Sequence, residues 1–225
     1  MPYKLAVIST FTEEMAAYST PQIEQVIRQA MADDTSTSLD SYLIDDVAAS
    51  AIRPAGLLVG ATPVTPNTTE SDPLAMAADL KNLAAAIVAN GGGRDIVFLM
   101  NPVQAMGIGL AQATDGTFIT VPDQLTRAVI SSQTVPVDTV IAVDAADFAT
   151  ATGDMPKYSV SDQATIHEED TTPLPLATGA QGSAVVASPI RSLWQTDSIG
   201  VRMVLDVSWA MRRAGMVAVA EGVTW

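Results

Sequence analysis

The sequence contains no cysteine and a single histidine, His167. Without cysteine the chain can form neither a disulfide framework nor a thiolate metal site, and one histidine cannot build a multi-histidine metal site. Any Ser-His-Asp arrangement would have to use His167 as its base. These absences predict a chain that holds no metal ion, and they restrict catalysis to schemes that use His167.

Charged residues are scarce, and basic ones are scarcer than acidic ones. Asp, Glu, Lys and Arg make up 16% of the 225 residues, with 11 basic against 25 acidic side chains and a formal charge of −14. Such a charge opposes any affinity for nucleic acid or anionic lipid that depends on basic side chains. Hydrophobic residues reach 48%, so we expect part of the surface to face neighbouring protein rather than water or DNA.

Long apolar runs are absent as well. A membrane-spanning helix needs about 18 uninterrupted apolar residues, and no such run occurs. The apolar run near the N-terminus, within residues 3–10, is too short for the core of a signal peptide. The sequence therefore predicts a protein that is made in the cytoplasm and has no membrane partner.

The first third of the sequence predicts one strand and two helices. Residues 3–10 have the composition of a strand, and residues 13–17 that of a short helix. Thr20 followed by Pro21 is a typical helix start, and the apolar residues after it recur at helical spacing. We therefore predict one long helix over residues 21–46.

The middle of the sequence begins at a proline-rich boundary, residues 61–73, and then alternates helices with strands. The predicted helices are 73–89 and 101–112, and the predicted strands are 95–100, 117–121 and 139–143. The segment Gly91–Gly93 follows the first of these helices and is predicted to cap its C-terminus. Residues 150–188 are predicted to be rich in loops, with short strands at 158–160 and 165–167.

The C-terminal segment alternates apolar and other residues with the period of a strand. From Ile199 to Met211 every second residue is apolar. Arg213–Gly215 then has the composition of a turn, and residues 216–225 carry a second alternating pattern. We therefore predict a long β-hairpin within Leu193–Trp225.

The same segment resembles the C-terminal end of the major capsid proteins of tailed bacteriophages and prophages. Residues 192–203, 207–213 and 222–225 carry the strongest likeness. Residues 12–21, 140–148 and 161–167 also resemble segments of that family. The resemblance therefore extends through most of the chain.

The resemblance implies an α+β architecture, the Hong Kong 97 phage capsid fold. In that fold a peripheral domain holds a long spine helix against long antiparallel strands, and an α/β axial domain is inserted into it. Here residues 21–46 would form the spine helix, and 3–10, 198–212 and 216–225 the strands. The discontinuous peripheral domain would comprise residues 1–65 and 191–225, and the axial domain residues 66–190.

The function that the resemblance implies is structural. The chain would be a major capsid (head) protein that self-associates into pentamers and hexamers of an icosahedral shell in the virion. It would meet packaged DNA only indirectly, and it would use no catalytic residue and no cofactor. Family members carry an N-terminal arm and an extended loop before the first strand, so we expect this sequence to be N-terminally truncated. The full-length protein would then form the pentamers and hexamers, and this 225-residue chain by itself would form a monomer or small oligomer.

Two alternatives remain at this stage. A bacterial encapsulating compartment has a shell protein of the same fold, but it encloses enzymes instead of DNA. A small α/β hydrolase could use Asp144, Asp147 and His167, because carboxylates at the end of a strand often serve catalysis in α/β proteins. The competing structural interpretation is that Asp144 caps a short helix through Phe148 and that Glu168–Asp170, beside His167, belong to a solvated acidic loop rather than a cation site.

Overall fold

The computed structural model describes residues 3–18, 22–69, 72–110, 128–153, 155–167 and 190–225. The chain forms two compact units, each assembled from separate stretches of sequence. Unit 1 comprises Met1–Tyr3, Ser36–Thr152 and Val207–Trp225, and unit 2 comprises Lys4–Thr35 and Gly153–Asp206. The bounds of these units differ from the limits of the predicted axial domain, residues 66 and 190. The assignment of peripheral and axial domains stays a prediction.

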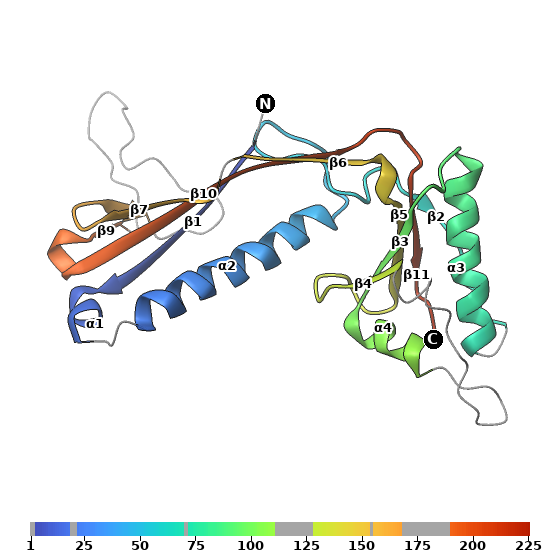
Figure 1. The fold of residues 1–225 in the computed structure, drawn as a ribbon, viewed down its shortest axis with the longest axis horizontal. Helices are drawn as coiled ribbons and strands as arrows, with labels where there is room; N and C mark the ends of the chain where they lie inside the picture. The colour runs from blue at the N-terminus through green and yellow to red at the C-terminus, as the bar shows by residue number, and fades with distance from the viewer. Residues whose placement is uncertain (1–2, 19–21, 70–71, 111–127, 154, 168–189) are drawn as a thin grey trace, which may run out of the picture. The chain divides into compact units, whose positions relative to one another are not determined.

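Unit 1 is organised around a five-stranded sheet with the strand order β2-β11-β5-β3-β4 (Figure 1). The strands are β2 (Thr62–Pro63), β11 (Val217–Glu221), β5 (Thr139–Asp144), β3 (Ile96–Met100) and β4 (Val129–Ser131). β5 pairs antiparallel with both β11 and β3, whereas β2 and β4 add parallel edges. All six residues of β5 are buried, as expected for the central strand of a sheet that is covered on both faces.

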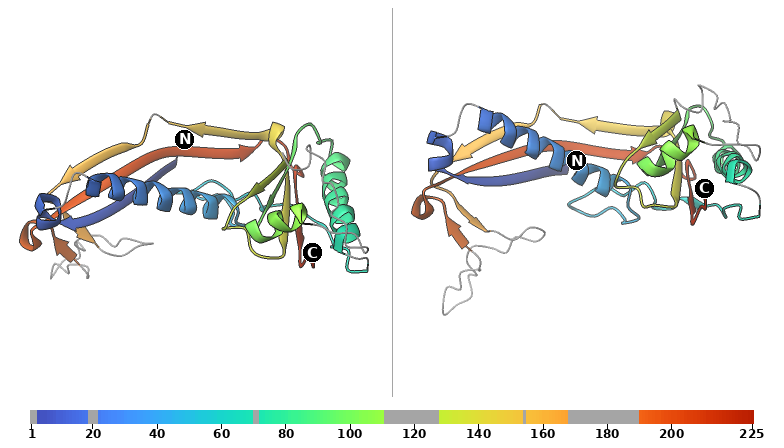
Figure 2. Two further views of the ribbon diagram at one scale, coloured as in Figure 1. Left: turned by 60° about the horizontal axis from the view of Figure 1, so that its bottom comes forward. Right: turned by 90° about the horizontal axis from the view of Figure 1, so that it is seen from below.

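Two apolar clusters cover the two faces of this sheet. Helix α3 (Asp72–Ala89) lies beside β11 and β5 (Figure 2), and it packs Leu83 and Ile87 against alternate sheet residues such as Val140 and Ala218. Helix α4 (Pro102–Gly109) adds Ile108 to the same cluster. On the opposite face, a second cluster joins Ile44, Leu57, Val135, Ile141, Val143 and Val217.

Unit 2 contains strand β1 (Tyr3–Thr12) except its first residue, which belongs to unit 1. It also contains helix α1 (Glu13–Tyr18) and the first part of α2 (Gln22–Leu43). Strand β10 (Ser198–Met211) contributes its first part to this unit, where it pairs with β7 (Lys157–Ser161) and neighbours β1. Strands β8 (Thr165–His167) and β9 (Ile190–Ser192) form a separate pair. Met31 of α2 and Met203 of β10 are both buried, and the Arg28 guanidinium lies 5.6 Å from the centre of the Tyr158 ring.

Most of the predicted elements are present. The helices predicted at 21–46 and 73–89 correspond to α2 and α3, and the strands predicted at 95–100 and 139–143 correspond to β3 and β5. The Thr20-Pro21 helix start and the strand predicted at 117–121 lie outside the described residues. Strand β6 (Phe148–Thr152), which pairs antiparallel with Val207–Met211 of β10, was not predicted.

The predicted hairpin between the last two strands is wrong. β10 pairs with β6 and β7, whereas β11 enters the five-stranded sheet between β2 and β5. The turn between them is real, and Gly215 takes a left-handed backbone conformation with φ +73°. Both faces of β11 are apolar, with Val217, Ala218 and Ala220 all buried. This strand therefore gains more burial in a sheet covered on both sides than beside β10, where most residues stay half-buried.

A buried carboxylate holds the last residue of the sequence in unit 1. Asp79 of α3 is fully buried, and its two oxygens accept hydrogen bonds from the Asn67 N–H at 2.7 Å and the Trp225 indole N–H at 2.9 Å. A buried carboxylate that loses a donor keeps the cost of its desolvation. The Trp225 side chain therefore stabilises unit 1 by a directed bond as well as by contact.

Trp225→Phe should lower the free energy of unfolding by about 2 kcal/mol, because it removes the indole donor and leaves an Asp79 oxygen without that partner. Urea denaturation followed by circular dichroism would measure the change. Trp194→Phe is the matched control, since Trp194 is 72% exposed and its replacement should change stability by less than about 0.5 kcal/mol. Equal effects of the two substitutions would contradict a structural role for the bond between Trp225 and Asp79.

Candidate functional site

The three residues of the hydrolase alternative fall in different units. Asp144 is the last residue of β5, and Asp147 ends the short 3-10 helix η1 (Ala145–Asp147); both belong to unit 1. His167 is the last residue of β8 in unit 2. Within unit 1 the two carboxylates therefore lie together without the base that a triad would need.

Asp144 is fully buried, and its carboxylate is surrounded by backbone donors. Oδ2 accepts hydrogen bonds from Gly93 and Arg94 at 2.7 and 3.2 Å, and Oδ1 accepts from Asp95 and Ala146, both at 3.2 Å. The bond from Ala146 confirms that Asp144 caps a short helix, although this helix is η1 and ends at Asp147. The other three donors belong to the turn after α3, which lies about 50 positions earlier in the sequence.

These donors decide the protonation state of Asp144. Burial raises the pKa of this carboxyl, but the four backbone N–H groups oppose that effect and hold the pKa below its ordinary value. A carboxylate offers about four acceptor sites, and here four backbone N–H groups occupy them. Asp144 is therefore an ionised structural anchor, and its occupied oxygens leave no geometry for accepting a proton from a substrate.

Asp147 is held by a side chain from the turn between β10 and β11. The Arg213 guanidinium donates two hydrogen bonds to Asp147 Oδ2, of which the bond from Nε measures 3.0 Å, and it donates a third to the Gly91 carbonyl at 3.0 Å. The Arg212 N–H donates to the Asp147 carbonyl at 2.9 Å. The Arg213 hydrogen bonds outweigh the effect of burial, so the pKa of Asp147 is lowered and that of Arg213 is raised.

The two carboxylates thus fasten three segments of unit 1. They connect the end of β5, the turn at residues 91–95 and the turn at residues 212–216, where the Met216 carbonyl also accepts the Asp144 N–H at 3.0 Å. Gly91 has a φ of +83° and closes the end of α3, as predicted for the Gly91–Gly93 segment. The sequence did not indicate Arg213 as the partner of Asp147, because 66 positions separate the two residues.

The described part of the chain contains no cluster of metal ligands and no membrane-spanning helix. Its His, Asp and Glu side chains form no group of three or more that could hold a metal ion. Glu168–Asp170, beside His167, lie outside the described residues. None of the described helices is long and apolar enough to cross a membrane.

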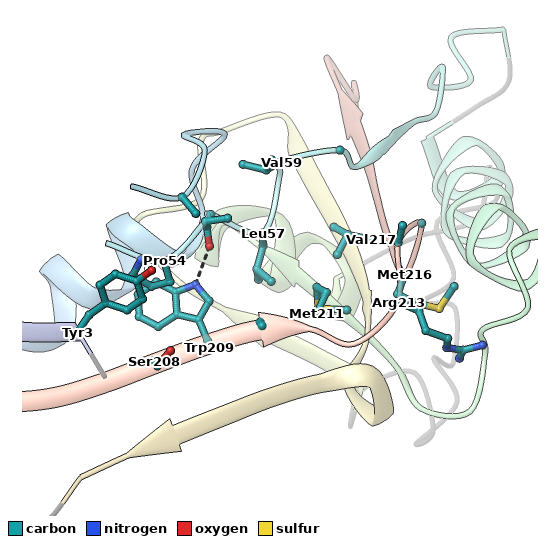
Figure 3. Close-up of a pocket in the computed structure, with 17 residues that line it drawn as sticks. Tyr3, Pro54, Leu57, Val59, Ser208, Trp209, Met211, Arg213, Met216 and Val217 are labelled. Carbon is teal, nitrogen blue, oxygen red and sulfur yellow. Dashed lines mark hydrogen bonds between the residues drawn. The ribbon is translucent and has the colours of Figure 1, made fainter. Parts of the chain in front are cut away.

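A surface groove of about 530 Å³ lies on unit 1 beside this junction (Figure 3). Its lining comes from Tyr3, Ala49, residues 54–57, 59 and 60, and residues 208–211 and 213–217. In Figure 3 the 54–60 segment lies on one side of β10 and β6 lies on the other. The Trp209 indole N–H donates to the Ala55 carbonyl at 2.8 Å, which fixes the wall of the groove to β10.

The chain is similar in sequence to phage capsid proteins. The phage capsid family matches residues 1–178. The capsid polyprotein of Pseudomonas phage PAJU2 is 27% identical over 243 aligned positions that cover the whole chain but 34% of that protein. The chain thus spans about a third of the length of the curated relative it matches.

Solved structures resemble the chain over almost its full length. A structure from Mycobacterium phage Cain superposes with a TM-score of 0.71 at 13% identity, covering 99% of this chain and 72% of that one. A structure from Mycobacterium phage Bobi gives a TM-score of 0.70 at 16% identity over 98% of this chain and 72% of that one. The capsid of a native GTA particle gives 0.62 at 11% identity over 99% of this chain and 73% of that one.

These structural matches confirm the predicted α+β, Hong Kong 97-type fold. The family match covers most of the chain, and the carboxylates considered for catalysis are engaged in structural bonds. The chain therefore belongs to the phage capsid family.

Proposed function

We propose that the chain acts as the major head subunit of a tailed phage or prophage. In this role it self-associates into pentamers and hexamers, and these form an icosahedral shell in the virion that encloses DNA. The family match over residues 1–178 carries the proposal. The likeness to capsid structures over nearly the whole chain supports the fold that this role needs.

The surface of the chain supports a role in association. Large apolar side chains are exposed in both units, including Ile52 at 81%, Val103 at 71% and Met106 at 69% in unit 1, and Met155 at 88% and Trp194 at 72% in unit 2. Val103 and Met106 lie three residues apart on α4, so they share one side of that helix. Grouped exposed apolar residues are typical of surfaces that contact other proteins.

The net charge bears on what the shell would enclose. With 25 acidic and 11 basic residues, the subunit would gain little from phosphate contacts, and packaged DNA would be confined rather than bound.

We further propose that residues 1–65 and 191–225 act as the peripheral domain and residues 66–190 as the axial domain. The proline-rich segment at residues 61–73 supports a domain boundary near residue 66.

Electron microscopy of particles formed by the complete gene product in bacterial cells would test the function. We expect closed shells with fivefold and sixfold clusters of subunits and with nucleic acid inside. Shells that enclose a folded enzyme would instead indicate a bacterial compartment. A protein that never assembles, and whose measured hydrolytic turnover is lost in Asp144→Asn and Asp147→Asn, would contradict the proposal.

A further inference from the structure

One asparagine of the sequence, Asn90, is followed by glycine, whereas Asn67, Asn82 and Asn101 precede threonine, leucine and proline. Glycine has no side chain to hinder its own backbone nitrogen, which can therefore attack the side-chain amide of the asparagine before it. We propose that Asn90 is a deamidation site, and that the fold of unit 1 restrains the reaction until the end of α3 opens. This modification does not depend on the proposed function.

The reaction has two steps and needs no cofactor. The backbone nitrogen of Gly91 loses its proton and forms a bond to Cγ of Asn90, while the bond from Cγ to Nδ2 breaks. The departing nitrogen takes up the proton and leaves as ammonia. Water then opens the resulting five-membered imide at either of its carbonyl groups, which gives aspartate or isoaspartate. No atom changes its oxidation state, and water is the second reactant.

Two hydrogen bonds hold the Asn90 side chain away from the nitrogen that would attack it. Asn90 Nδ2 donates to the Ala86 carbonyl at 3.0 Å and to the Gly215 carbonyl at 3.2 Å. Ala86 lies one helical turn earlier, so the first bond directs the side chain back toward the start of α3. Gly91 lies in the opposite direction along the chain, and Cγ is therefore kept out of its reach.

The attacking residue is fixed as well. The Gly91 N–H donates to the Val88 carbonyl at 2.9 Å, and the N–H of Gly92 donates to the Ile87 carbonyl at 3.1 Å. The Gly91 carbonyl accepts a hydrogen bond from the Arg213 guanidinium at 3.0 Å. Gly91 is thus held at both its nitrogen and its carbonyl oxygen, and the reaction requires these contacts to open.

This opening can occur without unfolding of the five-stranded sheet. Asn90 is exposed and lies one residue beyond the end of α3. The glycines at Gly91–Gly93 gain more backbone freedom on opening than other residues would. Helix ends open at a lower free energy than the core of a protein does. We therefore expect the folded chain to react slowly through a small opened fraction.

The product cannot restore the original contact. Deamidation replaces the Nδ2 donor by an oxygen, which would face the Ala86 and Gly215 carbonyl oxygens and be repelled by both. Isoaspartate also adds a methylene to the backbone next to Gly91, where φ is +83°. The modification therefore weakens, irreversibly, the contact between the end of α3 and the turn before β11.

Mass spectrometry would test the proposal after incubation of the 225-residue chain at mildly alkaline pH, in buffer and in guanidinium chloride. Cleavage after Lys81 and Arg94 gives one peptide that contains both Asn82 and Asn90, and fragmentation locates the converted residue. We expect Asn90 to convert at least about tenfold more slowly in buffer, because the folded chain reacts only through its opened fraction. In guanidinium chloride Asn90 should convert faster than Asn82. Equal rates in either comparison would overturn the proposal.

Gly215 offers a variant with a matched control. A Cβ at Gly215 would lie 2.7 Å from Cγ of Asn90, whereas a Cβ at Gly222 would meet no atom within 4 Å. Both glycines have left-handed backbones, with φ of +73° and +76°, so alanine is similarly strained at each. Gly215→Ala should speed conversion of Asn90 in buffer at least about threefold relative to Gly222→Ala. Equal rates in the two variants would overturn the restraint, and if Gly215→Ala does not fold, the parent's rates in buffer and in guanidinium chloride decide alone.

Discussion

Val217→Asp is expected to lower the free energy of unfolding by more than about 4 kcal/mol, because it places a charge without a partner in the core. Val217 is 4% exposed and lies opposite Val143 of β5, in the cluster that contains Ile141 and Leu57. Backbone pairing holds β11 between β2 and β5, so the strand cannot turn to carry the new carboxylate out of this cluster. Urea denaturation would measure the change.

The matched control is Val207→Asp on β10. Val207 is half-buried, opposite Thr152 of β6, so its replacement should cost no more than about 1–2 kcal/mol. The comparison tests the strand assignment directly. If β10 and β11 formed the hairpin that alternation suggests, both substitutions would have similar effects, and equal losses would contradict the sheet described above.

Asp144→Ala is expected to lower the free energy of unfolding by about 3–4 kcal/mol. The substitution removes the buried acceptor of four backbone N–H groups at a partly buried junction, and a donor that loses its partner costs about 1–3 kcal/mol where water cannot replace the acceptor. Asp95→Ala is the control, since Asp95 is exposed at the same junction. The variants should differ by at least about 2 kcal/mol in urea denaturation.

The lowered pKa of Asp144 also predicts how the stability of the fold depends on pH. Its pKa is lower in the folded state than in the unfolded chain, so its contribution is complete above the unfolded value of about 3.9 and is lost as the pH falls through the folded value. Asp147, whose pKa is lowered chiefly by Arg213, contributes in the same direction. Denaturation midpoints should therefore fall below about pH 4, and they should fall less steeply in Asp144→Ala.

Helices α2 and α3 could be predicted because their length and their start and stop signals come from neighbouring residues. The side of α3 that is buried could not be predicted in this way. Apolar residues occur nearly all around this helix, and the structure buries Ala75, Met76 and Leu80 but leaves Leu74 and Val88 more than half exposed. When several sides are apolar, the tertiary contacts decide which one is buried.

Strand pairing was the part that local patterns could not supply. Period-two alternation shows that a segment is extended, but it does not identify the neighbouring strand. For this reason β11 was placed beside β10, whereas it pairs with β5, which is more than 70 positions earlier in the sequence. Strand β6 was missed because its residues after Phe148 are alanine and threonine, all of them exposed.

The capping role of Asp144 could be predicted, whereas most hydrogen-bond donors to Asp144 and Asp147 could not. A strand followed by Asp144 indicated a cap, and the structure confirms it with the bond from Ala146. The donors at residues 93–95 and the Arg213 guanidinium come from distant turns. A single sequence has no local signal for such contacts, so their discovery required the structure.

The position of β11 has a consequence for synthesis on the ribosome. Of the described strands it is the last to be made, yet it fills an inner position in the order β2-β11-β5-β3-β4. Until residues 217–221 emerge, the edge of β5 that will bind β11 stays open, and open strand edges promote pairing between nascent chains. The sheet can therefore be completed only after residues 217–221 have left the ribosome, and a pause in synthesis before that point should increase aggregation during expression.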